Sequence, residues 1–442
     1  MRMNDINLVD LKKGLKEQFD KFQGNINGQG KLAFNEVRKH ALQQLEKIQF
    51  PTVKDEEWKY TNVQKILKHE FAFDLPSSGK IQEIESYIIP DLDAHRLVFV
   101  NGKLSEELSE IGQENGLTVL NIKDAQTQYG ELVNEHLSKY AAFEEDAFTA
   151  LSTAFTAEGA FIKVDKNKII EKPILIFNFT DSTAANAIAM PRNLVIAEEN
   201  AQVTVIEDYA AIGDNYGFIN SVTEFKVSKN AIVHNYKLQN KSDKNFFIGT
   251  TQVHQEGDSH YNNTTITLGG DLVRNNLNIL LDGEHCEAFM NGLYLLKDKH
   301  HVDNHSMVDH LKPNSYSNEL YKGIMDGESK GVFNGKIFVR PDAQKTNAFQ
   351  ENKNILLSDK ASIDTKPQLE IWADDVKCSH GATTGALDEE PVFYLRSRGI
   401  DEDKAKALLM FAFANDVLER IKSEPFKNHV AKLIGERLKQ EI

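Results

Sequence analysis

The spacing of apolar residues changes twice along the chain. Near the start, apolar side chains recur every three or four positions, as the buried face of an amphipathic helix requires. These positions are Leu8, Leu11, Leu15, Phe19 and Phe22, followed by Phe34, Val37, Ala41, Leu45 and Ile48. The stretch "GNINGQG" separates the two sets, since glycine and asparagine accept backbone conformations that end helices. The pattern predicts two helices that open a mostly helical region, residues 1–160, in which "RLVFVNGKL" is expected to form a strand and turn.

Between residues 161 and 390 the period of the apolar residues shortens to two, which is the period of a β-strand. Segments such as "NLVIA", "QVTVIED", "VTEFKV" and "GVFNGKIFV" follow one another in close order. Helical stretches of crossover length are almost missing, which argues against a doubly wound α/β fold. A sandwich, a barrel and a β-solenoid all remain compatible with this run of short strands.

Asparagines recur in part of this region at nearly even intervals. Asn275, Asn291, Asn304, Asn318, Asn334 and Asn347 are separated by 16, 13, 14, 16 and 13 residues. In a β-solenoid, asparagines at equivalent corners of successive coils can hydrogen-bond one above another, which predicts such a rhythm. Asparagines enriched in unrelated turns would produce it as well. The rhythm narrowly favours a solenoid.

The last part of the chain, residues 391–442, returns to a helical pattern. Asp401 is placed to cap the start of a helix. The expected buried stripe of that helix consists of Ala405, Leu408, Leu409, Ala412 and Val417, and a second helix carries Val430, Leu433, Ile434 and Leu438. Such stripes usually pack within one chain, but a terminal helix pair has few neighbours, so a partner surface is the alternative.

The composition is that of a globular protein, with 442 residues, 40% hydrophobic residues and 26% charged residues. A net charge of -15 argues against nucleic acid or an anionic membrane as partner, because both attract basic surfaces. The start of the chain has no signal-peptide core, and no apolar run reaches the roughly 18 residues that a spanning helix needs. We therefore expect a cytoplasmic protein. Cys286 and Cys378 are too few for a disulfide framework, so we expect reduced thiols.

Common catalytic and nucleotide-binding motifs are missing from the sequence. It has no G-x-x-x-x-G-K-[ST] phosphate loop, no G-x-S-x-G elbow and no H-E-x-x-H helix. The chain is therefore not expected to bind ATP through such a loop or to belong to the common hydrolase classes.

Histidines cluster in "KHHVDNHSMVDH", which contains His300, His301, His305 and His310. Because alternate residues of a strand share a face, His301, Asp303 and His305 could converge on a metal ion. Imidazoles on a solenoid face could equally hydrogen-bond their neighbours, and this second interpretation is favoured.

The segment "DVKCSH" places Cys378 and His380 two residues apart at the end of the strand-rich region. On a strand they would point to one face, about 7 Å apart along the chain. A thiolate and an imidazole could bind iron or zinc, but they supply two ligands of four. A partner protein or another residue would have to complete the site. The alternative is a buried cysteine and a hydrogen-bonded histidine at a strand end.

Four stretches together resemble one protein family. They are "FPTVKDEEWKYT", "LVFVNG", "RNLVIAEENAQVTVIEDY" and, nearly without gaps, the segment from Ser317 to Ile400. All are similar to the SufB/SufD family of iron-sulfur cluster assembly proteins. The resemblance implies a right-handed parallel β-helix (β-solenoid) between helical terminal regions. Leu395, where SufB proteins carry a cysteine, is typical of the SufD branch of the family.

The resemblance also implies partners and a site. Members of the SufD branch pair with SufB through the β-helix core and bind the ATPase SufC through C-terminal helices, so ATP hydrolysis is expected on SufC and this chain is expected to be non-catalytic. His380, with Cys378 beside it, matches the position at the SufB-SufD interface where a transient iron or nascent iron-sulfur cluster is expected. The isolated chain is expected to hold no stable cofactor and could form a homodimer. The alternatives are a β-solenoid enzyme acting on polysaccharide and a purely structural scaffold subunit.

Overall fold

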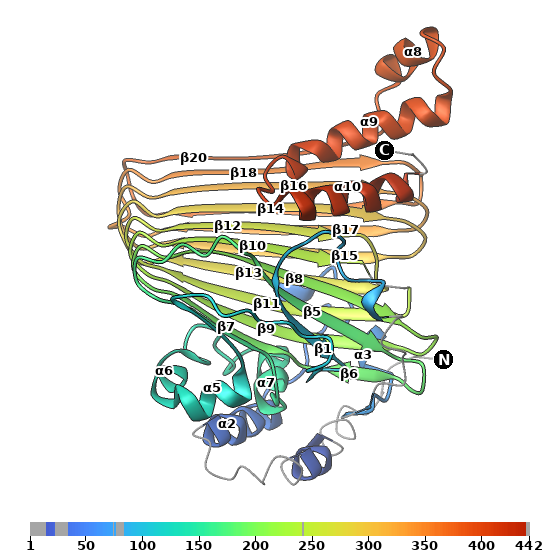
Figure 1. Ribbon diagram of the computed structural model, residues 1–442. Helices are drawn as coiled ribbons and strands as arrows, with labels where there is room; N and C mark the ends of the chain where they lie inside the picture. The colour runs from blue at the N-terminus through green and yellow to red at the C-terminus, as the bar shows by residue number, and fades with distance from the viewer. Residues whose placement is uncertain (1–14, 23–33, 74, 77–83, 241–242, 439–442) are drawn as a thin grey trace.

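The centre of the molecule is a parallel β-solenoid of about 8 turns, flanked by N- and C-terminal helices (Figure 1). The computed structural model describes residues 15–22, 34–73, 75–76, 84–240 and 243–438. The solenoid predicted from the strand pattern and the asparagine rhythm is therefore confirmed. Its right-handed sense stays a prediction.

Two sheets, parallel except for one antiparallel pair at the start of each, form the walls of the solenoid. We name each sheet by its last strand. In spatial order the β20 sheet contains β2 (Lys103–Leu104), β1 (His95–Val100), β5 (Ile174–Asp181), β8 (Gln202–Ile212), β10 (Ile232–Gln239), β12 (His260–Thr267), β14 (Glu287–Leu296), β16 (Tyr316–Met325), β18 (Asn347–Leu356) and β20 (Lys377–Gly385). The opening pair β1 and β2 is antiparallel, and the other strands of this sheet pair in parallel.

The β19 sheet is the opposite wall. In spatial order it contains β19 (Ser362–Ile371), β17 (Lys330–Val339), β15 (His301–His310), β13 (Leu272–Leu281), β11 (Asn245–Gln255), β9 (Gly217–Val227), β7 (Arg192–Ala197), β4 (Ala160–Val164) and β3 (Leu117–Asn121), with β6 (Ala187–Ala189) also paired to β9. β1, β2 and β3 precede residue 160, so the mostly helical N-terminal region also supplies strands to the solenoid. The expected strand in "RLVFVNGKL" is β1.

Each coil of the solenoid contains one strand from each sheet. Successive strands of the β20 sheet, from β10 to β20, begin 28, 27, 29, 31 and 30 residues apart. The asparagine spacing of 13 to 16 residues is therefore about half a coil, and it places one of these asparagines on each successive strand instead of one at each corner. Of those six asparagines, only Asn275 and Asn304 lie side by side in register, and their side chains share a hydrogen bond of 3.1 Å. The prediction that these asparagines occupy corners was wrong.

A different set of asparagines stacks at a corner. Asn167, Asn200 and Asn230 each have φ between 56° and 61°, the left-handed region that asparagine tolerates better than most residues. Their side chains form a ladder, with Nδ2 to Oδ1 distances of 2.6 Å and 2.7 Å. Residues with positive φ continue through the later coils at Asp258, His285, Asn314 and Lys345. The corner is thus a repeated backbone conformation that several residue types occupy.

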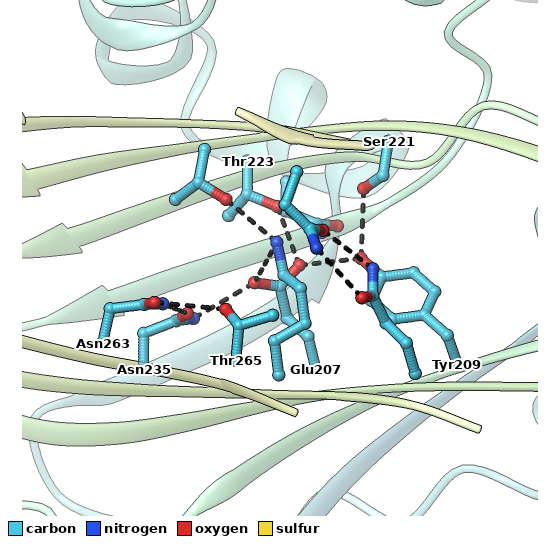
Figure 2. A network of polar contacts seen from close by, with 12 residues as sticks. Glu207, Tyr209, Ser221, Thr223, Asn235, Asn263 and Thr265 are labelled. Carbon is cyan, nitrogen blue, oxygen red and sulfur yellow. Dashed lines mark hydrogen bonds and ion pairs between the residues drawn. The ribbon is translucent and has the colours of Figure 1, made fainter. Parts of the chain in front are cut away.

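The interior of the solenoid is partly polar (Figure 2). Glu207 is fully buried and accepts hydrogen bonds from Tyr209 Oη at 2.8 Å, Thr223 Oγ1 at 3.0 Å and Asn235 Nδ2 at 3.1 Å. Apolar side chains from both sheets pack around this network. Burying a carboxyl group without hydrogen-bond partners would destabilise the folded state, and these bonds therefore allow a glutamate to lie between the two sheets.

Helices from the N-terminal region cover the outer face of the β19 sheet. They are α2 (Phe34–Lys47), η2 (Glu56–Trp58), α3 (Gln64–Leu67), α5 (Ile122–Gln128), α6 (Gly130–His136) and α7 (Ala147–Ala154). Phe148 and Trp58 pack in one apolar cluster with Phe218 and Phe246 of the sheet. The helix predicted over the second apolar set is confirmed as α2. Residues 15–22 are helical, while Leu8 and Leu11 lie outside the described residues.

The C-terminal helices are α8 (Glu389–Ser397), α9 (Glu402–Leu418) and α10 (Glu424–Arg437). Asp401 caps α9 as predicted, accepting a hydrogen bond of 3.0 Å from the Asp403 backbone. α9 and α10 lie against the outer face of the β20 sheet, and α8 projects away from it (Figure 1). Within the described residues no helix is long and apolar enough to span a membrane.

The predicted buried stripe of α9 is only partly correct. Ala405 and Val417 are buried, but Leu408 is 40% exposed and Ala412 is also exposed. The sheet contacts a face that includes Ala407, Met410 and Ala414 instead. The helix is apolar on nearly every side between residues 405 and 414, so spacing alone could not select the buried face.

Candidate functional site

The end of the solenoid formed by its last two strands is open, and we refer to it as the open end. β19 and β20 are the last strands of their sheets, so within the described residues no further strand pairs with their outer edges. Both strands are mostly exposed or half-buried, whereas the strands before them are largely buried. An open parallel edge presents unpaired N–H and C=O groups, which is a surface suited to another chain.

Cys378 and His380 both lie on β20 and both face the interior of the solenoid. Parallel pairing places Cys378 beside Ala348 and His380 beside Gln350, and these two residues of β18 are buried. Side chains in register on neighbouring strands point to the same face of a sheet. The prediction that Cys378 and His380 share a face is confirmed, and their face is the one that looks into the open end.

The two side chains have different surroundings. Cys378 is half-buried and packs at the edge of an apolar cluster that includes Val339 and Ala348. Burial raises the pKa of the Cys378 thiol above its usual value, while a backbone hydrogen bond with Ala348 acts in the opposite direction. The thiol is therefore the favoured form near neutral pH, which weakens Cys378 as a metal ligand in the isolated chain. The His380 side chain is exposed at the open end.

A buried polar pair lies directly beneath His380. Glu319 on β16 is in register with Gln350 on β18, which in turn is in register with His380. Gln350 donates a hydrogen bond of 2.6 Å to Glu319, and Ser306 of the opposite sheet donates another to the same carboxyl group. Burial raises the pKa of Glu319 to about 7, although both hydrogen bonds act to lower it. Sequence reasoning missed this pair, whose only signal was polar residues at inward positions of two strands.

The geometry of the open end supplies two donors for a soft or borderline metal ion. A thiol sulfur and an imidazole nitrogen on one strand face leave at least two coordination positions of a tetrahedral site to other ligands. Because these side chains lie at an unpaired edge, a second chain that continues the sheet could bring the missing ligands within reach.

The histidines of β15 do not converge as a metal site. His301, Asp303 and His305 share the outer face of the β19 sheet, as the strand period predicts, but residues 50–61 cover them. Thr61 donates to Asp303, and Thr61 Oγ1 lies 2.9 Å from His301 Nε2. The interpretation that these imidazoles bond their neighbours is therefore the correct one.

Asp303 joins the 50–61 segment to the sheet. Its carboxylate contacts Arg274 Nη1 at 2.8 Å and His305 Nε2 at 3.0 Å. Arg274 also donates to the Glu57 carbonyl oxygen at 2.7 Å and lies 3.7 Å from the centre of the Trp58 ring. Burial would raise the pKa of Asp303, but its ion pairs with His305 and Arg274 outweigh burial and lower it. This cluster of charges is structural and fixes the N-terminal segment.

His310 and His300 also have local partners. His310 is fully buried inside the solenoid, with Nε2 2.9 Å from Ser317 Oγ. His300 Nε2 lies 2.7 Å from Asp243 Oδ1. Among the described residues, only Asp243, Asp298 and His300 form a group of three whose possible metal-ligand atoms lie within 4.8 Å of one another. The hydrogen-bonded pair of His300 and Asp243 accounts for most of that proximity, and both aspartates are exposed.

The C-terminal helices expose apolar side chains. Phe393 and Tyr394 on α8 are 72% and 57% exposed, and Leu408 on α9 is exposed as well. Leu395 is half-buried on α8. Monomeric proteins usually avoid grouping large exposed apolar residues, so α8 and the neighbouring part of α9 have the character of a docking surface.

Comparison with protein families matches nearly the whole chain. Residues 179–413 match the model described as "SUF system FeS cluster assembly, SufBD core domain", and residues 9–176 match "SufBD protein N-terminal region". The chain is similar to an iron-sulfur cluster assembly SufBD family protein of Synechocystis, with 34% identity over 91% of this chain and 90% of the relative. It is also similar to the iron-sulfur cluster assembly protein SufD of Escherichia coli, with 32% identity over 90% and 91%. A third relative is the Arabidopsis thaliana protein ABCI7, chloroplastic, with 31% identity over 65% and 63%.

Proposed function

The chain belongs to the SufBD family of iron-sulfur cluster assembly proteins, and from that premise we propose that it is a SufD-like subunit of a Suf assembly scaffold. In this proposal it pairs with SufB, binds the ATPase SufC and supports nascent cluster formation without catalysing a reaction itself. Iron or the cluster is cargo of the complex and not a resident cofactor of this chain. The expected cytoplasmic location belongs to the same proposal.

One observation carries the proposal: His380 and Cys378 face into the end of the solenoid formed by β19 and β20, where neither strand has a further strand on its outer edge within the described residues. A second solenoid that pairs with β20 or β19 would extend the sheets by main-chain hydrogen bonds, which is a common mode of strand addition. It would also cover the two donors and exclude water from a metal between the chains. The same strand therefore offers both the pairing edge and the ligands.

The two donors do not have equal roles in this proposal. His380 is exposed and needs only to be neutral to bind iron, whereas the Cys378 thiol must lose a proton that burial retains. We assign the principal ligand role to His380 and a lesser role to Cys378. SufB supplies the remaining ligands. The isolated chain should consequently be colourless and hold little iron after anaerobic reconstitution.

The test compares iron per complex after co-expression with SufB and SufC. His380→Ala should lower iron retention and cluster yield, and Cys378→Ser should have a smaller effect. Thr384→Ala is the matched control, because Thr384 lies on the same strand and the same face but offers no imidazole or thiol. Gel filtration of each complex reports whether assembly is intact.

Two outcomes would count against this role of the site. If His380→Ala dissociates the complex, the histidine is an interface residue and its metal role is abandoned. If His380→Ala assembles normally and retains full iron and cluster yield, the chain is a purely structural scaffold subunit. A polysaccharide-acting enzyme has only fold analogy in its favour, whereas relatives named for iron-sulfur cluster assembly cover most of the chain.

We further propose that SufC binds the exposed apolar face of α8 and the nearby part of α9. A deletion from Asp401 onward would remove helices that cover the outer face of the β20 sheet, so point variants are the cleaner test. Phe393→Ser and Leu408→Ser should each reduce co-purification of SufC while SufB pairing persists. Ile169→Ser, at an exposed apolar position far from these helices in sequence, is the control. Unchanged SufC recovery in both variants would exclude this docking surface.

A further inference from the structure

The interior of the last three coils is arranged in layers that end at His380. Ser306 faces Glu319 in the first layer, and register places Gly335 and Gln350 in the second. Pro367 and His380 occupy the third layer. The side chains of His380 and Gln350 therefore lie on the same face of neighbouring strands, whose backbones are about 5 Å apart.

Gly335 makes room for the Gln350 side chain. A Cβ atom at position 335 would lie 2.1 Å from Gln350 Nε2, closer than any real contact. With hydrogen there instead, the long side chain of Gln350 can extend across the interior and reach the carboxyl group of Glu319. The position of the amide is thus set by a neighbour that has no side chain.

The two polar atoms of the Gln350 amide have different partners. Nε2 donates to Glu319 at 2.6 Å. Once the Glu319 carboxyl group is ionised, as in alkaline solution, this bond fixes the orientation of the amide, because a carboxylate only accepts hydrogen bonds and cannot pair with the amide oxygen. Oε1 is buried and has no hydrogen-bond partner among the described residues. Gln350 as a whole is 1% exposed. A buried carbonyl oxygen without a hydrogen-bond donor lowers the stability of the folded state by roughly 1–3 kcal/mol. A donor that reaches this oxygen would recover that free energy.

On the open side of Gln350, the neighbouring side chain on β20 that carries an N–H is His380. It is the in-register neighbour of Gln350 on β20, and Pro367 opposite offers neither a backbone N–H nor a polar side chain. A neutral imidazole carries one N–H and one lone pair on separate nitrogens. If the N–H is directed into the solenoid, the lone pair is directed out of the open end.

We propose that Gln350 is a positioning residue for His380, held in place by Glu319 and accepting the ring N–H of His380 through its free Oε1. This inference rests on the proposed function for its biological meaning. The hydrogen bond selects one tautomer and turns the other ring nitrogen toward the partner chain. Histidines that bind metals usually donate their second nitrogen to an oxygen acceptor in this way, and removing that acceptor typically weakens metal binding about 10–100-fold.

The test reads the tautomer of His380 in the isolated full-length chain, without metal or partner. Selective ¹⁵N-histidine labelling at mildly alkaline pH gives the chemical shifts of both ring nitrogens, and His380→Gln identifies the signals of His380. The wild-type protein should show one dominant tautomer. Gln350→Met, which keeps the length of the side chain but removes the acceptor, should shift the ring nitrogens toward the tautomer mixture of a free imidazole.

Two further variants separate positioning from damage to the interior. Asn352→Leu removes another buried amide from β18, but its in-register neighbour on β20 is Ala382, so the tautomer of His380 should not change. The exchanged pair Glu319→Gln with Gln350→Glu keeps a hydrogen bond between the two positions and places a carboxylate acceptor beneath His380. This double variant should restore the single tautomer and iron retention in the complex.

Identical ring-nitrogen shifts in wild type, Gln350→Met and the exchanged pair would overturn the inference. So would a wild-type His380 that already shows the free mixture. Neither result depends on whether His380 binds iron, so the inference can fail while the proposed function stands. Conversely, if the tautomer is fixed by Gln350 but His380→Ala retains full iron, only the proposed function fails.

Discussion

Glu319 should make the stability of this protein fall as pH rises through neutrality. Its pKa is raised by burial from 4.5 to about 7, so the folded state favours the protonated carboxyl group. The stabilisation is fully present below the unfolded value of 4.5 and is lost as pH rises through about 7. This difference between the folded and unfolded pKa of Glu319 lowers the free energy of unfolding by about 3 kcal/mol between low pH and the pH at which the carboxyl group is ionised in both states.

The measurable part of this effect lies between about pH 6 and about pH 8, where linkage gives a difference of about 1.3 kcal/mol. Glu319→Gln removes the titration and keeps the shape, with its oxygen toward Gln350 and its amide NH₂ toward Ser306. Urea unfolding of both proteins at the two pH values gives the free energies. The variant should gain about 1.3 kcal/mol relative to wild type across the interval.

A control separates this effect from general pH sensitivity. The pKa of Glu328 is lowered, mainly by its hydrogen bond with Lys360, so Glu328 is ionised in folded and unfolded protein throughout this pH interval. Glu328→Gln should therefore parallel the wild type. If Glu319→Gln also parallels the wild type, Glu319 does not titrate near neutrality and the reasoning about its burial is wrong.

Three other substitutions test the packing around the site and the N-terminal segment. Gly335→Ala should cost roughly 1–3 kcal/mol by urea unfolding, because the new methyl group overlaps the Gln350 amide. Asp303→Asn removes the carboxylate paired with a buried arginine and should cost about 3–5 kcal/mol, with faster hydrogen exchange in residues 50–61 and no change at the open end. Burial lowers the pKa of His310 to about 4, so the folded state favours the neutral imidazole, and the stability of the protein falls as pH drops from about 6.5 toward 4. His310→Gln should therefore reduce the acid-induced loss of stability, as measured by urea unfolding at about pH 5. Unchanged acid sensitivity in that variant would refute this assignment.

Several structural features were already determined by the order of residues. The change from a helical to a two-residue period located the strand-rich core, because the period of buried positions is a local property of each element. Asp401 was identified as a helix cap for the same reason, since a cap acts within one turn. The shared face of Cys378 and His380 also followed from strand alternation alone. The family, too, was recognisable in short stretches of the sequence such as "FPTVKDEEWKYT" and "RNLVIAEENAQVTVIEDY".

Tertiary structure decided everything that depends on which coil lies beside which. The asparagine rhythm was real but was assigned to corners, because one-dimensional spacing cannot distinguish one residue per strand from one per corner. The face of α9 that packs on the sheet was likewise undetermined in a helix that is apolar on most sides. Gln350 and Glu319 are 31 residues apart, and only the length of the coil brings them together beneath His380. Which residues of neighbouring coils come into contact depends on the total number of residues in the strands and turns of a coil. A pattern within one short segment of the sequence does not reveal that number.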